Sequence, residues 1–159
     1  MKEYKLIKEF YGTQTTQRSG LLLINHIEDG LKILEAISAS QRAQKAYCLH
    51  PILQSDEAFN QNISMNFSGV SSDVLLLTME YRRVANSYLS SMNPHNFVGF
   101  SCTDVRHMLV ADKIQNYKDF MKYHFGKHER TNQLFQYFNN WFDLLDINYE
   151  KDWSSFSFA

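Results

Sequence analysis

The sequence predicts an all-α fold, organised as a single helical domain over residues 1–159. Three observations favour it: apolar residues recur at steps of three and four along most of the chain, strand-type alternation of Val and Ile is nearly absent, and only two prolines and six glycines interrupt the sequence. With 44% hydrophobic residues over 159 positions, the chain is long and apolar enough to bury one sizeable core.

The N-terminal half predicts three helices. Residues 2–11 carry an apolar stripe at helical spacing, and the polar stretch 12–20 is typical of a loop. A second helix is expected over 23–39 and a third over 40–53, which Pro51 should break or kink because proline lacks a backbone N–H.

The C-terminal half predicts three more helices, after a polar stretch at 55–70 without a clear pattern. The first begins at Ser71 or Ser72 and ends at Asn93-Pro94; the second follows an N-cap at Thr103 and covers 104–125, ending at Gly126. An aromatic amphipathic helix over 129–145 comes last. The tail, 152–159, carries three aromatic residues and is expected to pack back onto the body, with a tail that docks to a partner as the alternative.

The overall charge argues against several classes of function. Sixteen basic and 17 acidic residues give a net charge of −1, so the sequence lacks the basic character of a protein that binds long nucleic acids. No apolar run is long enough to span a membrane, and the charged N-terminus does not resemble a secretory signal. The two cysteines, Cys48 and Cys102, form no CxxC pair and are expected to be reduced thiols in a cytoplasmic protein.

The residues with the strongest chemical signal are His26, His50 and Asp112. Each lies in or beside a predicted core helix with apolar neighbours, where a carboxylate is costly to bury unless it is paired or binds a cation. Two imidazoles and a carboxylate suit Mn²⁺, Fe²⁺ or Zn²⁺. The structural alternative is that Asp112 pairs with a basic residue such as Arg106, and that His50 forms a hydrogen bond at the Pro51 break.

A second histidine pair, His124 and His128, has the i, i+4 spacing that can chelate a metal on one helix face. Gly126 lies between the two, and the flanking charges are typical of an exposed helix end. A solvated role is therefore the simpler interpretation. No Gly-rich phosphate loop, nucleophile elbow or HExxH motif is present.

Three blocks of the sequence resemble the HD-domain hydrolases of the RelA/SpoT type, which include the small alarmone hydrolases. The block YGTQTTQRSGLLLINH, residues 11–26, keeps the length, the Gln, the Ser-Gly and the final His of the family's first motif. The block YCLHPILQSD, residues 47–56, resembles "LLHDxxED", and MLVADKIQN, residues 108–116, resembles "KLADKxxN". The resemblance covers about residues 8–125, in the family's order and with its separations.

The resemblance implies an HD-type helical bundle with a divalent metal, Mn²⁺ above all, on His26, His50 and Asp112. Pro51 stands where the family has a fourth ligand, and Gln54-Ser55 stand where the family has the acidic pair that acts on the attacking water. The implied catalytic residue is therefore Asp56, one or two positions later.

The implied substrate contacts are Arg18, displaced from the family's basic position, and Asn116, which is kept. Two functions follow. The first is a divergent metal-dependent phosphohydrolase acting on a small nucleotide, with an alarmone as the analogical substrate. The alternative is a catalytically inactive relative that binds a nucleotide or a protein partner. The aromatic helix 129–145 fits either a homodimer interface or an aromatic-rich core.

Overall fold

All regular structure in the described part of the chain is helical, as the sequence predicts. The computed structural model describes residues 1–17, 19–62, 64–65, 67–89 and 97–158, and within these ranges it has no strand, only an isolated bridge between Thr15 and Leu22. The helices are α1 (Lys2–Tyr11), α2 (Ile24–Ala36), α3 (Gln41–Leu53), α4 (Asp56–Asn62), α5 (Ser72–Leu89), α6 (Thr103–Asp119), α7 (Thr131–Leu145) and α8 (Tyr149–Asp152).

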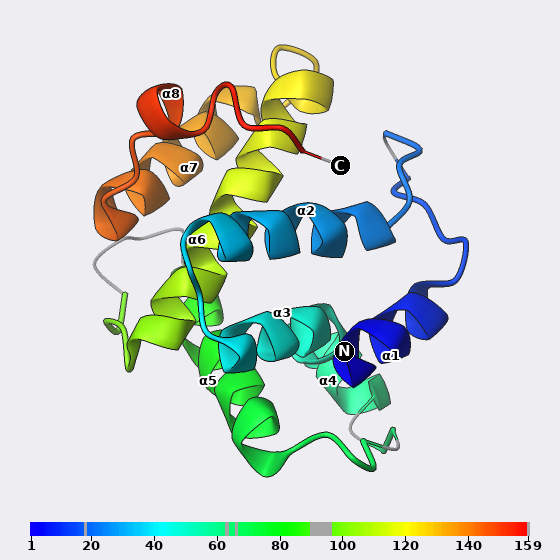
Figure 1. Cartoon of the computed structure of the whole chain (residues 1–159). Coiled ribbons are helices and arrows are strands. Elements are labelled where there is room, and N and C mark those ends of the chain that lie inside the picture. The colour runs from blue at the N-terminus through cyan, green and yellow to red at the C-terminus, as the bar shows by residue number, and fades with distance from the viewer. Residues whose placement is uncertain (18, 63, 66, 90–96, 159) are drawn as a thin grey trace.

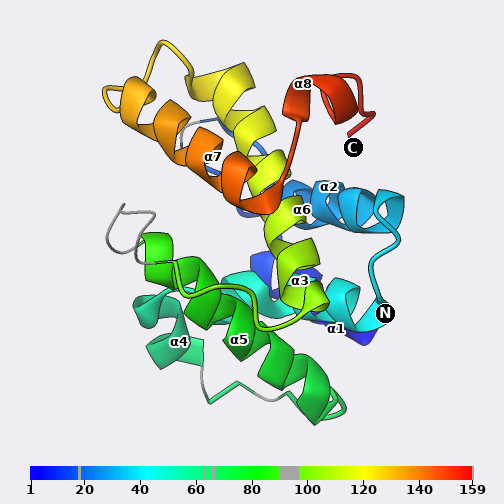
Figure 2. The same cartoon turned by 90° about the vertical axis from the view of Figure 1, so that its left-hand side faces the viewer.

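Helix α3 lies at the centre of the arrangement and packs against α1, α2, α4, α5 and α6. Figure 1 shows α2 and α3 side by side across the middle of the molecule, with α6 running past both. In Figure 2, α7 and α8 cover one end of α6, at the opposite end of the molecule from α4 and α5. One continuous apolar core joins these elements, and its largest fully buried side chains include Trp141, Tyr47 and Tyr81.

Helix α3 begins as the sequence predicts, because Ser40 caps it by accepting a hydrogen bond from the Ala43 amide at 3.0 Å. The Ser40 hydroxyl also donates to Asp104 Oδ1 at 2.8 Å, and Arg42 Nε donates to Asp104 Oδ2 at 2.7 Å. These bonds join the start of α3 to the first turn of α6.

Helix α3 ends at Leu53, as expected, but Pro51 does not break it, since the helix continues through the proline. Helix α6 starts at Thr103 itself, with Cys102 as its N-cap, and its last predicted turn is a π-helical segment, Phe120–His124. The helix expected to begin at Ser71 or Ser72 is α5, which begins at Ser72 and confirms that start. Its expected end near Asn93-Pro94 lies outside the described residues.

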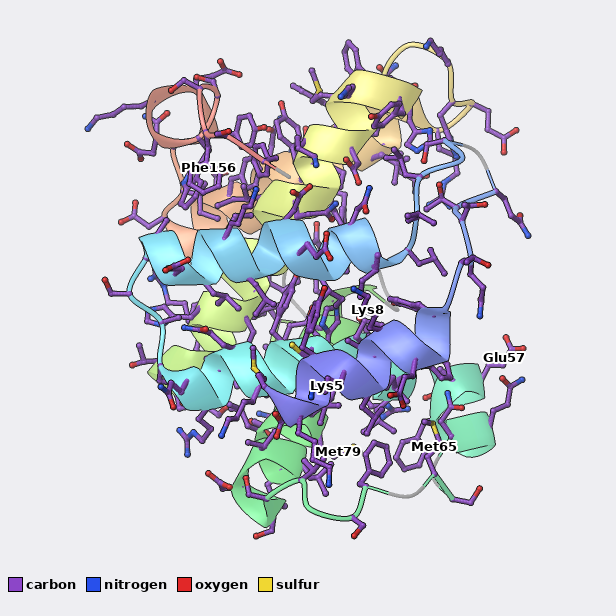
Figure 3. The ribbon with its side chains drawn as sticks, turned by 45° about the vertical axis from the view of Figure 1, so that its right-hand side comes forward. Lys5, Lys8, Glu57, Met65, Met79 and Phe156 are labelled. Carbon is purple, nitrogen blue, oxygen red and sulfur yellow. The ribbon has the colours of Figure 1, made fainter. Side chains whose placement is uncertain are left out.

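The aromatic helix α7 contributes to the core, which favours the second of its two interpretations. The buried face consists of Tyr137, Phe138, Trp141, Phe142 and Leu145. The tail packs back onto the body as expected: Trp153 is buried, and Phe156, labelled in Figure 3, and Phe158 contact the core. No helix in the described ranges is long and apolar enough to cross a membrane.

Candidate metal site

Three side chains from three helices meet where α2, α3 and α6 pack together. His26 lies in the first turn of α2, His50 in the last turn of α3, and Asp112 in the middle of α6. The His26 Nε2 atom lies 3.2 Å from His50 Nε2 and 3.5 Å from Asp112 Oδ1, and His50 Nε2 lies 3.7 Å from the same oxygen. Three residues that lie far apart in the sequence thus present three donor atoms to one point.

The spacing of these atoms fits a bound transition metal. The nearest point equidistant from three atoms at these separations lies about 2.0 Å from each, within the range of about 2.0–2.2 Å for nitrogen and carboxylate ligands to Zn²⁺-sized ions. Two imidazoles and one carboxylate leave further coordination positions for water or substrate. Among the described residues, this is the one group of at least three His, Cys, Asp or Glu side chains placed to hold a metal.

The outer nitrogen of His26 is fixed by a short hydrogen-bond chain along α6. Gln115 Nε2 donates to the Asp119 carboxylate at 2.6 Å, so Gln115 presents its oxygen to His26 Nδ1 at 2.5 Å. Because an amide oxygen only accepts, His26 Nδ1 carries the proton, and the Nε2 lone pair faces the site in the neutral imidazole. An outer partner of this kind orients the histidines of many metal sites.

The outer nitrogen of His50 is fixed by a backbone carbonyl. The His50 Nδ1 atom lies 2.6 Å from the carbonyl oxygen of Tyr47. In an uninterrupted helix, that carbonyl would accept from the amide of residue 51, but Pro51 has no N–H. The side chain therefore supplies the missing donor, which explains how α3 continues through the proline and leaves His50 Nε2 as the acceptor facing the site. The expected hydrogen bond of His50 at Pro51 is confirmed.

Asp112 pairs with its neighbours on α6 and not with Arg106. Lys113 Nζ donates to Asp112 Oδ2 at 2.7 Å and Asn116 Nδ2 donates to Oδ1 at 2.9 Å, whereas Arg106 donates to the carbonyl of Leu145. Burial by itself would raise the pKa of Asp112, but Lys113 and the two histidines hold that pKa below its usual range. The carboxyl group is ionised and 3% exposed.

The electrostatics keep His50 in the form that binds metals. Burial, and then the neighbouring His26, lower the pKa of His50 to about 3. At neutral pH its imidazole is therefore uncharged, with a free lone pair on Nε2. Lys113, which is 5% exposed, remains charged: burial would lower its pKa, but Asp112 raises it above its usual range.

The buried Tyr47 side chain packs against both histidines. Its ring centroid lies 4.6 Å from that of His50, and its hydroxyl lies 3.5 Å from His26 Nε2. Gly30 makes this placement possible, because a Cβ at that position would overlap the phenol oxygen and two ring carbons of Tyr47. No pattern in the sequence pointed to Gly30, since its role is seen only once α2 and α3 are packed.

A cavity of about 370 Å³ opens onto the three candidate ligands, a volume typical of small-molecule sites. Lys113, Asn116 and Asp119 line both this cavity and a neighbouring one of about 290 Å³. The predicted substrate contact Asn116 is therefore at the site. The remaining lining residues of the first cavity are Tyr11, Thr16, Leu23, Pro51, Gln54, Gln115 and Tyr137.

Asp56 is placed differently from its predicted role. It begins α4, its side chain is 88% exposed, and it forms an ion pair with Arg82. It does not line the cavity over the candidate ligands, and Glu57, the next residue, projects outward from the edge of α4 in Figure 3. The prediction required a change of helix register at Pro51, and the unbroken α3 leaves Asp56 beyond the end of that helix.

Two other sequence predictions have different outcomes. Arg18, the other proposed substrate contact, lies outside the described residues. His124 ends the π-helical segment and His128 follows a turn, so the pair does not share a helix face. Both histidines line the neighbouring cavity of about 290 Å³ instead.

Sequence reasoning missed Gln115, Lys113 and Tyr47 as partners of the three candidate ligands. Gln115 and Lys113 lie close to Asp112 in the sequence, yet only helix packing shows that the first reaches His26 while the second pairs with Asp112.

Comparison with known proteins gives no match: no family model, curated protein or solved structure resembles this chain significantly.

Proposed function

We propose that the protein is a divergent HD-type phosphohydrolase that holds a divalent cation, Mn²⁺ first among them, on His26, His50 and Asp112 and acts on a small nucleotide. The observation that carries the proposal is the convergence of the three donor atoms at 3.2–3.7 Å beneath an open cavity. A cation at this point would supply a water nucleophile near neutral pH.

The residues of the chain fit the other requirements of phosphate chemistry in part. Asp112 and two neutral imidazoles provide one negative charge for a dication, which leaves net positive charge to attract a phosphate. Lys113 and Asn116 line the same cavity, and each already donates a hydrogen bond to Asp112. We assign no catalytic role to Asp56, and the nucleotide, with an alarmone as the first candidate, rests on the resemblance to the RelA/SpoT type.

The test of the cation is a Mn²⁺ titration of thermal stability. Binding to the native state adds about 2.7 kcal/mol at a Mn²⁺ concentration one hundred times Kd, so the melting temperature should rise by several degrees. His26→Ala should remove the shift, because it deletes one candidate ligand that is partly exposed and least needed for packing. His107→Ala is the matched control, since His107 lies on α6 but lines a different cavity. A wild-type protein without a Mn²⁺ shift would refute the proposal.

The second candidate is a nucleotide-binding protein without turnover. It is favoured by the residues at the positions of the family's fourth ligand and acidic pair, since Pro51 and Gln54 line the cavity and carry no carboxylate. Release of pyrophosphate or orthophosphate from a panel of nucleotides, measured with Mn²⁺ present, separates the two. Turnover that His26→Ala abolishes supports the hydrolase, whereas nucleotide binding without turnover supports the alternative.

A further inference from the structure

We propose that Pro51 is a positioning residue of the metal site, and that it acts by reserving the Tyr47 carbonyl for His50. The inference rests on the proposed metal-dependent function. The resemblance to the RelA/SpoT type implies only that Pro51 replaces a metal ligand, and the inference gives this proline a role of its own.

The first step is the backbone. The amide of residue 51 is the ordinary helical partner of the Tyr47 carbonyl, and a proline cannot supply it. The carbonyl is buried inside α3 and needs a donor, because an unsatisfied buried polar group costs free energy. His50 Nδ1, at 2.6 Å, is that donor. Any other residue at position 51 would bring back a competing N–H.

The second step is the tautomer. A carbonyl oxygen only accepts, so His50 Nδ1 must carry the proton and its Nε2 must present a lone pair. The same logic holds for His26, whose Nδ1 faces the oxygen of Gln115. The two Nε2 atoms therefore meet at 3.2 Å with no proton between them in the neutral state, and Asp112 Oδ1 lies 3.5 and 3.7 Å away.

The third step concerns the partner that these three acceptor atoms favour. If the His50 proton could move to Nε2, the two imidazoles would form an N–H···N hydrogen bond and satisfy one another without a ligand. With both outer nitrogens occupied, three acceptor atoms point at one another, and a cation is the partner that satisfies all three at once. Pro51 thus removes the metal-free alternative and prepares the site for the ion.

The test is Pro51→Ala, which restores the backbone N–H and is compatible with the helix. Without metal, its melting temperature should equal or exceed that of the wild type, because alanine is the better helix former. Its Mn²⁺ affinity should nevertheless fall by about tenfold or more, as for other residues that orient a ligand from behind. A purely structural proline would leave the affinity unchanged. Gln44→Ala is the matched control: it alters α3 but leaves the Tyr47 carbonyl and the cavity over the three ligands untouched, so its Mn²⁺ affinity should equal that of the wild type.

A second readout needs no metal. Long-range ¹H–¹⁵N spectra of the histidine side chains report which ring nitrogen carries the proton, and wild-type His50 should be entirely in the Nδ1–H form, with a mixture in Pro51→Ala. A Pro51→Ala protein that keeps wild-type Mn²⁺ affinity within twofold, or an unchanged His50 tautomer, overturns this inference alone. A wild-type protein that does not respond to Mn²⁺ overturns the proposed function as well.

Discussion

The stability of the metal-free protein should fall as the pH is lowered from 7.5 to 5, and His50 should cause much of the loss. Its pKa is about 3 in the folded protein, where burial and the neighbouring His26 oppose protonation, against about 6.5 in an unfolded chain. Between these values the unfolded chain binds the proton and the folded protein does not. Acid therefore favours unfolding, and the stability contribution is fully present only above pH 6.5.

The magnitude follows from the two pKa values. A tenfold difference in proton affinity between the folded and unfolded chains corresponds to about 1.4 kcal/mol, so His50 alone should cost about 2 kcal/mol between pH 7.5 and pH 5, and about 4 kcal/mol by pH 3. The pKa of Asp112 lies below its usual range, so its own contribution is lost only near and below pH 4 and has the same sign. Measurements above pH 5 therefore exclude the contribution of Asp112, and the comparison of the wild type with His50→Gln isolates that of His50.

The assay is urea unfolding at a series of pH values between 5 and 7.5, with a chelator present, for the wild type and His50→Gln. Removing the titrating group should flatten the profile by about 2 kcal/mol over this interval. Gln44→Ala, a substitution on α3 that removes no titrating group, should keep the wild-type slope. Parallel profiles for the wild type and His50→Gln would refute the argument, because they would show that His50 is not buried as a neutral group.

Three further predictions concern side-chain packing and ion pairs, two of them at the site and one away from it. Gly30→Ala should lower stability by about 1–3 kcal/mol in urea unfolding, because its Cβ would overlap the Tyr47 phenol; a neutral effect would contradict that contact. Lys113→Met should cost about 3 kcal/mol or more, since it leaves the buried Asp112 carboxylate without its cation, and a loss below about 1 kcal/mol would show that the pair is not buried. Asp56→Asn should change stability by less than about 1 kcal/mol and leave the Mn²⁺ affinity unchanged, because Asp56 is exposed and pairs with Arg82. A tenfold loss of Mn²⁺ affinity would show that Asp56 contributes to the metal site.

The helices were predictable because their signals are local. Apolar spacing places α1, α2 and α7 to within a few residues, and the helix expected over 40–53 matches α3. The effect of Pro51 inside α3 was not predictable in this way. A proline ordinarily ends a helix, but whether it does depends on the fate of one carbonyl, and at Tyr47 that carbonyl is satisfied by the His50 side chain.

The candidate ligands were predictable for a different reason. A histidine or aspartate among apolar neighbours is costly unless it has partners, so the sequence favours a common site for His26, His50 and Asp112, and the structure brings them together. Their outer partners depend on which helix faces meet in space. For that reason the sequence suggests Arg106 beside Asp112, where Lys113 is found, and it gives no indication that Gln115 reaches His26.

The Tyr47 carbonyl also determines how a residue with a backbone N–H at position 51 would affect the candidate ligands. A carboxylate at position 51 would add a donor atom, but its backbone N–H would also compete with His50 for the Tyr47 carbonyl. Proline offers no donor atom but leaves the carbonyl to the imidazole, so His26, His50 and Asp112 are each held by an outer partner. Outer partners of this kind orient the ligands before an ion arrives, which lowers the cost of binding it. The three candidate ligands are therefore consistent with a metal site that has no carboxylate at position 51, provided that the histidine tautomers remain fixed.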